Sequence, residues 1–479
     1  MAWIAITVFA AVLIAAFVAV CACVAKPTVE PIAPQTLPAG VGKFVNREQM
    51  LDIVQRDHFN FFRVNQQPKT GMVLDRNTPT SPASIASIGF ALTVYPVAVQ
   101  RGWCSRAEAS DFTLRVLRNL SGTPQGTAST GVSGNKGFFY HFLDPETGTR
   151  STAPGFGLCE LSSIDTALMM AGVLFAQQYF DRNDASEGEI RALADALYKR
   201  VEWDWMSDAN GEVYMAWHPD RGFSKELWHG YSEGQLIYIL GMGSPTHPLK
   251  DGAWNAHIMH VQPTEHYGRR YVLLNGGPLF TYQYAHCWIP FKGIRDDKAR
   301  EMGFDWFENA RRATIAQICY AVENPMRWRG YNALNWGLTA CDGPGGFKRV
   351  IKGVEREFRG YSERGCPGGF DDGTIAPTAA ISAMPFTPNI SQRTLESWLA
   401  KYPELYTAQG FRDSFNPTID ETRPTGWVDT DSIGIDQGPI VLMIENHRTG
   451  FVWDVMKKSP ALRAGLTRAR FRGGWLHSS

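Results

Sequence analysis

A helical hydrophobic period runs through almost the whole chain after about Asn46. Apolar residues recur at three- and four-residue spacing, as in Met50, Ile53, Val54 and Phe61, and Gly/Pro-rich stops separate the segments. Strand-like alternation is scarce, so the pattern predicts an all-α fold. A second helix is expected to open at Ser81-Pro82 and to run to about Gly102. Further helices are predicted over Arg106–Leu120, Ser163–Phe180, Glu187–Trp205, Ser232–Leu240, Phe304–Asn324, Pro377–Met384, Gln392–Lys401 and Gln437–Arg448.

Helices of two kinds alternate along the sequence. Charged, one-faced helices such as 187–205 are followed or preceded by almost wholly apolar ones such as 163–180. An outer ring of helices around an inner ring would produce this alternation. The roughly 430 residues that follow the first segments suffice for about six outer–inner pairs. We therefore expect a single domain over residues 46–479 with an (α/α)6 toroid fold.

Composition limits the function. The chain has 47 Lys and Arg against 47 Asp and Glu, and this balance argues against a nucleic-acid partner. Hydrophobic residues make up 44% and charged residues 20%, which argues against a disordered chain and against a multi-span membrane protein. Aromatic residues reach 12%, more than a core usually takes. The surplus predicts a surface that stacks on flat ligands.

The N-terminal segment is predicted to direct the protein to a membrane. Residues 2–25 carry no charge, and Val20-Cys21-Ala22-Cys23 resembles a lipoprotein cleavage box with Cys23 as the acceptor. An uncleaved anchor and ordinary cleavage after Ala25 are the alternatives. Residues 1–25 are thus a signal or lipoprotein-type segment, and the Pro-rich residues 26–45 form a tether. We expect an exported monomer, periplasmic or lipid-anchored to the cell envelope.

Two cysteines of the remaining chain are candidates for a disulfide. Cys341 and Cys366 flank a Gly-rich segment and could bridge in an exported protein, although buried free thiols fit equally well. The cysteines lack CxxC spacing, and no other cluster with metal-ligand spacing appears. We expect neither a metal nor a cofactor.

Four carboxylates fall at the starts of predicted inner helices: Asp165, Glu233, Asp372 and Asp436. In a toroid with parallel inner helices these ends converge, and converging carboxylates beside aromatics are what glycoside cleavage requires. Helix capping is the alternative, since Ser162 with Asp165 fits a capping box and Asp436 could cap its helix. A capping box of Ser232 with Gln235 would leave Glu233 without a capping role.

Aromatic and basic residues near these positions could contact a sugar. Trp228 and Tyr231 precede Glu233, while Tyr238, inside the helix, fits the core better. Arg76 could hold a sugar hydroxyl, orient a carboxylate or form a surface salt bridge. The long Gly-rich polar segments 121–160 and 339–370 are typical of functional loops.

Taken in order, five motifs resemble the bacterial glucoamylase-like domain family. They are Asp75-Arg76 followed by Ser84-Ile-Ala-Ser-Ile-Gly-Phe90; Glu160-Leu-Ser-Ser-Ile-Asp165; Gly230-Tyr-Ser-Glu233-Gly; Asp372-Gly-Thr-Ile-Ala-Pro; and Gly434-Ile-Asp436-Gln-Gly-Pro-Ile. The resemblance spans nearly the whole chain after the tether. It implies an (α/α)6 toroid, a β-1,2-glucan substrate of oligo- or polysaccharide size, and inverting hydrolysis.

The resemblance also implies roles for individual residues. Glu233 matches the general acid, and Asp165, then Asp372, are the choices for the base. The implied sugar contacts are Arg76, Glu160, Trp228, Tyr231, Asp413, Asn416, Asp436 and Gln437. Gly-rich insertions near 122–137 and 343–369 could block or lengthen the groove, which leaves endo or exo cleavage open.

Two alternative functions remain. The same scaffold could hydrolyse or transglycosylate another glycan, or it could bind glycan without turnover as an anchored lipoprotein. A polysaccharide lyase is disfavoured, because elimination from a uronate needs a clustered basic site and the chain has no net basic excess.

Overall fold

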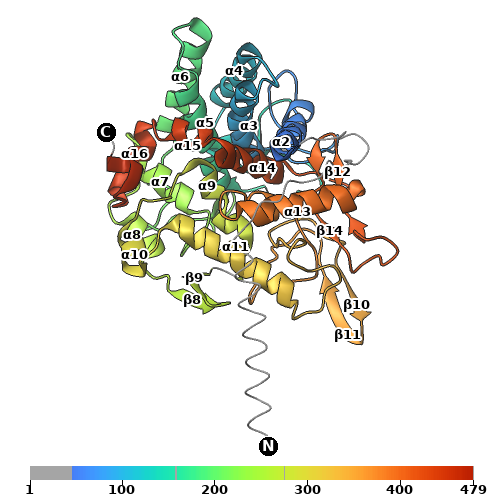
Figure 1. Cartoon of the computed structure of the whole chain (residues 1–479). Coiled ribbons are helices and arrows are strands. Elements are labelled where there is room, and N and C mark those ends of the chain that lie inside the picture. Colours follow the sequence, from blue (N-terminus) through green and yellow to red (C-terminus); the bar gives the residue numbers. More distant parts are fainter. Residues whose placement is uncertain (1–45, 157–158, 274–275, 478–479) are drawn as a thin grey trace, which may run out of the picture.

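The computed structural model describes residues 46–156, 159–273 and 276–477, and helices dominate it (Figure 1). The predicted leader (1–25) and tether (26–45) lie outside the described residues. Small sheets accompany the helices, so the all-α prediction is confirmed for the dominant elements and incomplete for the rest.

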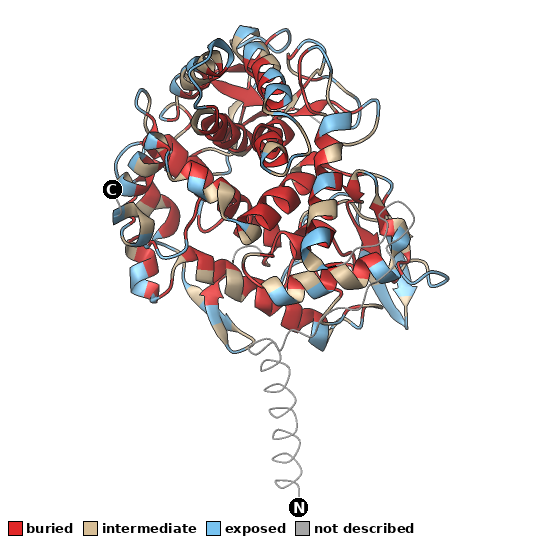
Figure 2. Cartoon of the chain, turned by 45° about the horizontal axis from the view of Figure 1, so that its top comes forward, coloured by how far each residue is buried: buried red, intermediate tan, exposed pale blue. Residues whose placement is uncertain are grey.

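Buried helices form the centre of the molecule. They are α3 (Ile85–Gln100), α5 (Ser163–Tyr179), α7 (Gln235–Gly243), α9 (Tyr284–Trp288), α12 (Pro377–Ile381) and α14 (Gly434–Arg448). Figure 2 shows such helices as almost entirely buried ribbons. Helix α14 packs on α3, α3 on α5, and α5 on α7, while α12 and α9 both contact α14. The first and last of these helices are therefore neighbours in space.

Small residues allow the central helices to approach closely. A Cβ placed on Gly172 of α5 would lie 2.1 Å from the carbonyl oxygen of Gly89 on α3, and a Cβ on Gly89 would lie 2.4 Å from the carbonyl oxygen of Leu168. The two backbones touch at this point, which only glycine permits. The close packing of α3 on α5 therefore depends on Gly89 and Gly172.

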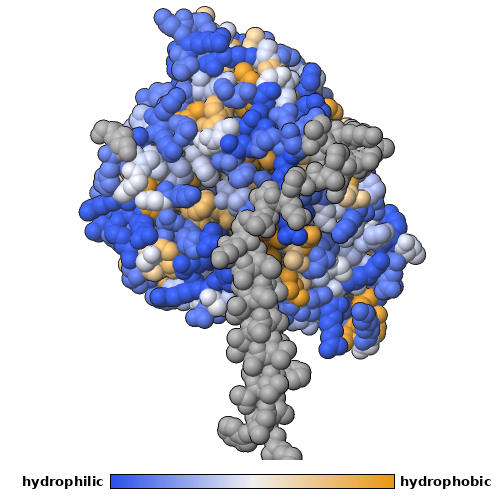
Figure 3. Space-filling view, viewed as in Figure 1, coloured by the Kyte–Doolittle hydropathy of each residue, from blue (hydrophilic) through white to orange (hydrophobic). Residues whose placement is uncertain are grey.

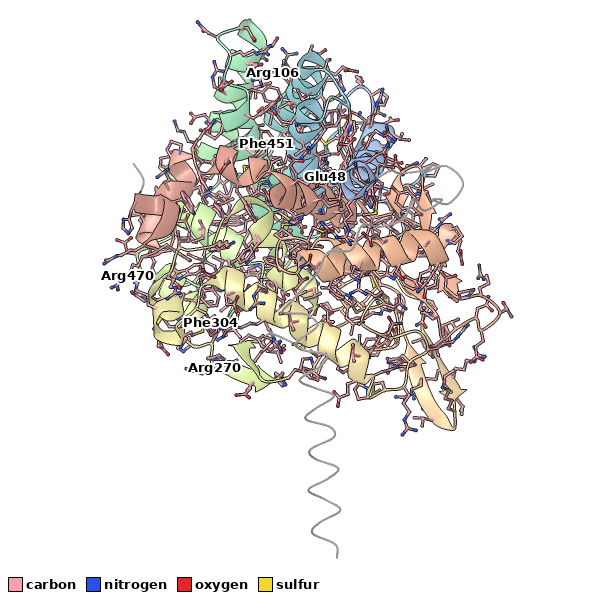
Figure 4. The ribbon with its side chains drawn as sticks, viewed as in Figure 1. Glu48, Arg106, Arg270, Phe304, Phe451 and Arg470 are labelled. Carbon is pink, nitrogen blue, oxygen red and sulfur yellow. The ribbon has the colours of Figure 1, made fainter. Side chains whose placement is uncertain are left out.

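Amphipathic helices cover the centre. They are α2 (Arg47–Val64), α4 (Arg106–Gly122), α6 (Ala185–Lys199), α11 (Trp306–Glu323) and α13 (Pro388–Lys401). Arg106, labelled in Figure 4, links α4 to α6 through a two-pronged ion pair with Glu187 at 2.6 and 2.8 Å, and its guanidinium lies over the ring of Tyr179. Shorter helices complete the set: α8 (Ala253–Ile258), α10 (Asp297–Met302), α15 (Phe451–Met456), α16 (Pro460–Arg468), and the 3-10 helices at Leu279–Tyr282, Pro403–Leu405 and Gly474–His477.

The strands are short and mostly antiparallel pairs. One five-stranded sheet has the order β2-β3-β5-β6-β7, made of Gly134–Asn135, Phe138–Tyr140, Leu161–Ser162, Ala216–His218 and Gly222–Phe223. The two-stranded sheets pair β1 (Ala83–Ser84) with β4 (Phe142–Leu143), β8 (Pro263–His266) with β9 (Arg269–Val272), β10 (Phe347–Ile351) with β11 (Val354–Phe358), β12 (Tyr406–Thr407) with β13 (Gly410–Phe411), and β14 (Phe415–Asn416) with β15 (Trp427–Val428).

Two predicted helix boundaries are wrong for the same reason. Helix α3 does not open at Ser81, because Ala83 and Ser84 first pair with Leu143 and Phe142, and Ser84 becomes the N-cap. The helix predicted over 187–205 ends at Lys199, because the chain turns away and the Glu202 amide donates to the carbonyl of Lys136. In both cases a backbone hydrogen bond to a residue distant in sequence replaces a hydrogen bond within the helix.

Of the two alternatives for Cys341 and Cys366, the disulfide bridge is not formed. Both thiols are free and buried, as the alternative prediction has it. The Cys341 sulfur lies 3.6 Å from a guanidinium nitrogen of Arg364.

The visible surface is mainly hydrophilic, with scattered apolar patches (Figure 3). One exposed apolar group belongs to the β10–β11 hairpin, where Val350 is 66% exposed and Phe347 and Val354 are also exposed. Among the described residues, no helix combines the length and the apolarity needed to cross a bilayer.

Candidate active site

Glu233 lies two residues before the first residue of α7, with Gly234 at the cap position. Its carbonyl accepts from the amide of Leu236 at 2.9 Å, but its side chain caps nothing. The side chain is 7% exposed, and within the described part of the chain its Oε2 atom has no hydrogen-bond partner. Burial raises the pKa of Glu233 to about 8, and the neighbouring carboxyls of Glu363 and Asp165 add to the increase. Glu233 is therefore protonated at neutral pH and has a proton to donate.

The predicted capping box of Ser232 with Gln235 is not formed, but Glu233 still has no capping role. The Ser232 hydroxyl accepts from the amide of Gly234 at 3.1 Å, and the cap position of α7 makes no side-chain hydrogen bond. Gln235 is fully buried at the first position of the helix.

A second group joins His141, Glu160 and Asp165. His141 Nδ1 lies 2.9 Å from Glu160 Oε1, and its Nε2 lies 3.7 Å from Asp165 Oδ2. Burial alone would lower the pKa of His141, but Asp165 and Glu160 together raise it to about 9. The ring is therefore an imidazolium between two carboxylates.

Backbone pairing assembles this group. Strand β3 pairs with β5, and the amide of His141 donates to the carbonyl of Glu160 at 2.9 Å. Ser162 caps α5 by accepting from the amide of Asp165 at 3.1 Å, and its hydroxyl donates to Asp165 Oδ2 at 2.5 Å. The predicted capping relation of Ser162 with Asp165 is present, and Asp165 still faces His141. His141 was not predicted from the sequence, although it lies in the Gly-rich segment 121–160, which is typical of a functional loop.

Arg76 is the centre of a third group. Its Nη1 atom lies 2.8 Å from Asp342 and 3.0 Å from Asp431, and its Nε lies 3.4 Å from Asp75. Of the three roles considered for Arg76, the structure favours the one in which it orients carboxylates. Asp342 and Asp431 lie in loops remote in sequence, which is why the sequence analysis missed them.

Further acids lie beside this arginine. Asp413 accepts from the amide of Asp342 at 2.7 Å and interacts with the carboxyl of Asp436 at the start of α14. Burial and neighbouring carboxylates raise the pKa of Asp436 to about 7, and burial with Asp413 and Asp342 raises that of Asp429 to about 8. Protonated carboxyls here can donate hydrogen bonds as well as accept them.

Two sets of side chains have the geometry to hold a cation. Asp342, Asp413 and Asp429 offer one ligand atom each within 4.8 Å of one another, and so do His141, Glu160 and Asp165. Arg76 already neutralises Asp342 in the first set, and the protonated His141 occupies the second. Both sets therefore carry an internal positive charge.

Several predicted site residues have structural roles instead. Asp372 forms an ion pair with Arg364, with both side chains fully buried, which argues against its use as a base. Tyr231 is fully buried between the rings of Tyr282 and Trp306, at 5.2 and 5.0 Å. Asn416 donates to the Asp372 carbonyl at 2.9 Å and to Thr374 Oγ1 at 3.0 Å. All three side chains are thus engaged by the protein itself.

Trp228 and Gln437 lie next to the acids but are held by the protein. The Trp228 indole donates to the hydroxyl of Ser163 at 2.8 Å, and its ring lies against Gly234, next to Glu233. The Gln437 amide donates to the carbonyl of Phe411 at 2.9 Å. Both side chains therefore form part of the wall around the buried carboxyl groups.

Tyr361 is an aromatic residue at this site that the sequence analysis did not select. Desolvation and the charges of Asp436, Asp413 and Asp75 raise its pKa, yet its side chain is 58% exposed. The residue is thus close to these acids and open to solvent.

The comparisons with known proteins agree with the predicted resemblance. Residues 226–460 match the family model described as "Putative glucoamylase". A solved structure of a protein with the same description, from Bacteroides uniformis, is 28% identical with a TM-score of 0.80 and covers 91% of this chain and 100% of that one. An endo-β-1,2-glucanase from Chitinophaga pinensis, solved with sophorotriose and glucose, is 26% identical with a TM-score of 0.78 over 90% of this chain and 100% of its own.

A curated relative extends the similarity at the sequence level. It is an exo β-1,2-glucooligosaccharide sophorohydrolase from Parabacteroides distasonis, 26% identical over 452 residues and 88% of this chain. The match spans 58% of that relative's own length. The resemblance to the glucoamylase-like family, with β-1,2-glucan hydrolases among its neighbours, is confirmed.

Proposed function

We propose that this protein is a glycoside hydrolase that cleaves β-1,2-glucan with Glu233 as the general acid. The observation that carries the proposal is a buried carboxyl with an oxygen atom not engaged by any described residue, and its burial raises its pKa to about 8. A general acid needs these properties to protonate the leaving glycosidic oxygen. The activities of the C. pinensis and P. distasonis proteins support the choice of substrate.

The proposed reaction is a single inverting displacement with Asp165 as the base. Glu233 gives its proton to the glycosidic oxygen as the bond to the anomeric carbon breaks. Water attacks that carbon from the opposite face, and Asp165 takes the proton that the water loses. Three observations favour Asp165 over Asp372: its contact with the His141 imidazolium, its bond to Ser162, and the burial of Asp372 against Arg364.

The surrounding polar groups are the proposed sugar contacts. Asp413, Asp436 and Glu160 offer carboxyl oxygens to hydroxyls, and Arg76 holds the neighbouring carboxylates in place. Trp228 and Gln437 complete the set. Each buried carboxyl that lacks a protein donor gains one when a sugar hydroxyl arrives.

We also propose that the helices form an (α/α)6 double ring and that the protein acts as a monomer. The contacts of α14 with α3, α3 with α5 and α5 with α7, under a cover of amphipathic helices, support the ring. An experimental structure in which α14 and α3 are apart would contradict it. A dimer in light scattering would contradict the monomer.

The test is incubation of the tether-free protein with linear β-1,2-glucan, followed by product size and anomeric configuration. We expect short β-1,2-linked products of inverted configuration, with activity that falls as the pH rises through about 8, where Glu233 loses its proton. Glu233→Gln keeps the shape and removes the acid, so its kcat is expected to fall at least a hundredfold, as for loss of a general acid.

The matched control is Glu189→Gln, which changes an exposed ion pair with Arg118 on the outer helices and is expected to keep full activity. Release of sugar by Glu233→Gln at the unsubstituted rate would overturn the assignment of the acid. Turnover of a different glycan would replace the substrate. Binding of the glucan without turnover would favour the glycan-binding alternative.

A further inference from the structure

We propose that Tyr361 is a sugar-stacking residue that sets affinity at the active site, and that the buried pair of Arg364 with Asp372 positions it. This inference rests on the proposed function, since it assumes a saccharide in the site.

Backbone register places Tyr361 at the acids. Ser362 and Cys341 exchange two backbone hydrogen bonds of 3.1 and 3.2 Å as an antiparallel bridge. The next residues along the two segments, Tyr361 and Asp342, are then opposite each other and point to the same face. Asp342 is bound to Arg76 at 2.8 Å, and its amide binds Asp413 at 2.7 Å. The ring of Tyr361 therefore stands over the carboxylates that are proposed to hold the sugar.

One arginine fixes the backbone on both sides of Tyr361. The Arg364 guanidinium donates to the carbonyls of Arg359 and Gly360 at 3.0 and 3.1 Å, and to those of Ser362 and Cys341 at 3.0 and 2.7 Å. Its Nε and Nη2 atoms also donate to Asp372, at 2.8 and 2.9 Å. The guanidinium and its partner carboxylate are fully buried.

This arrangement explains why a charge pair is buried here. A buried ion pair contributes little net stability by itself, but a guanidinium with every donor used specifies one backbone geometry. Asp372 is thus a positioning residue that keeps Arg364 charged and oriented, rather than the base that the sequence motif suggests. The side chain of Tyr361 is exposed, but the backbone on both sides of it is held by hydrogen bonds. Stacking on a pyranose ring therefore costs little additional conformational entropy.

The first experiment compares Tyr361→Ala and Tyr361→Phe in the hydrolysis of linear β-1,2-glucan. The alanine variant is expected to raise KM about tenfold, because it removes the ring face, while kcat changes much less. The phenylalanine variant keeps the face and is expected to stay within about twofold of the unsubstituted KM. Equal KM values for the alanine variant and the unsubstituted protein would overturn the proposal.

A double-substitution cycle tests the positioning pair. Arg364→Lys keeps a positive charge for Asp372 but loses the fork that holds the loop carbonyls, so KM is expected to rise several-fold with kcat retained. In the Tyr361→Ala background the same change should have no further effect on KM. An additive effect would show that Arg364 does not act through Tyr361.

The design separates this inference from the proposed function. If the unsubstituted protein does not bind or cleave the glucan, the proposed function fails first. If it cleaves the glucan and Tyr361→Ala has an unchanged KM, only the stacking role fails. Should Arg364→Lys not fold, as judged by its thermal transition, the two Tyr361 variants still decide the matter.

Discussion

At the scale of single residues, His141 is the group on which the charge state of the site depends. It lies between Glu160 and Asp165, which raise its pKa to about 9. The raised pKa means that its favourable contribution to stability is complete below its ordinary value of about 6.5. That contribution is lost as the pH rises through about 9, where the folded protein releases the proton.

His141→Asn is expected to move the acidic limb of the pH profile of kcat/KM upward. Burial already raises the pKa of Asp165, and the imidazolium opposes that rise, so its removal makes the carboxylate harder to form. A shift on the order of one pH unit is expected. The profile of the variant is measured against that of His260→Asn, which alters a histidine that lies beside His229 and has no ion pair among the described residues. An unmoved acidic limb would mean that His141 does not act on the base.

The residues recovered from the sequence share a local signature, and the missed ones do not. Glu233 and Asp165 could be selected because each lies at a recognisable helix start, one to three residues after a serine. Asp342 joins Arg76 across 266 residues of chain, and Asp431 does so across 355. No local pattern encodes such a contact. Tyr231 and Asn416 were selected for their chemical type, and burial, which the sequence around them does not reveal, gave them other roles.

At the scale of elements, glycine contacts fix how close the central helices come. Gly172→Ala would place a methyl group 2.1 Å from the carbonyl oxygen of Gly89, so α3 and α5 must separate. We expect a loss of about 1–3 kcal/mol or more in the free energy of unfolding, seen as a lower Tm. Gly188→Ala is the matched control, because a Cβ there meets nothing nearer than 3.8 Å, on a flexible arginine. The control should gain up to about 1 kcal/mol from helix propensity, and equal Tm values for the two variants would contradict the close contact.

Long helices were predictable and short strands were not, for a physical reason. Helices such as α4, α5 and α11 repeat their apolar spacing over several turns, so the observed bounds lie within a few residues of those expected. The strands of the five-stranded sheet have two or three residues each, which is too short to show alternation. Their pairing partners, for instance Leu161 with Trp217, come from different loops.

At the scale of the whole molecule, the N-terminal segment is the feature from which we predict the cellular location of the protein. We propose that it is exported and held at the envelope through a lipid on Cys23, on the basis of the uncharged residues 2–25 and the residues around Cys23. Cys23→Ser is expected to abolish incorporation of labelled fatty acid in cells and to release the protein from the membrane fraction. Cys21→Ser is the control, since it should leave both unchanged. Membrane association that persists in Cys23→Ser would favour an uncleaved anchor.

The contact of α14 with both α2 and α3 sets an order of events during synthesis. Helices α2 and α3 end at Val64 and Gln100, whereas α14, which packs against both, begins only at Gly434. Helix α3 can pack on α5 earlier, but until α14 has been synthesised the sides of α2 and α3 that face it have no native cover. Pairing across such a distance is slow, and the waiting intermediate is prone to aggregation. The surfaces of α2 and α3 that α14 covers are thus accessible to chaperones in the newborn chain until α14 has been made.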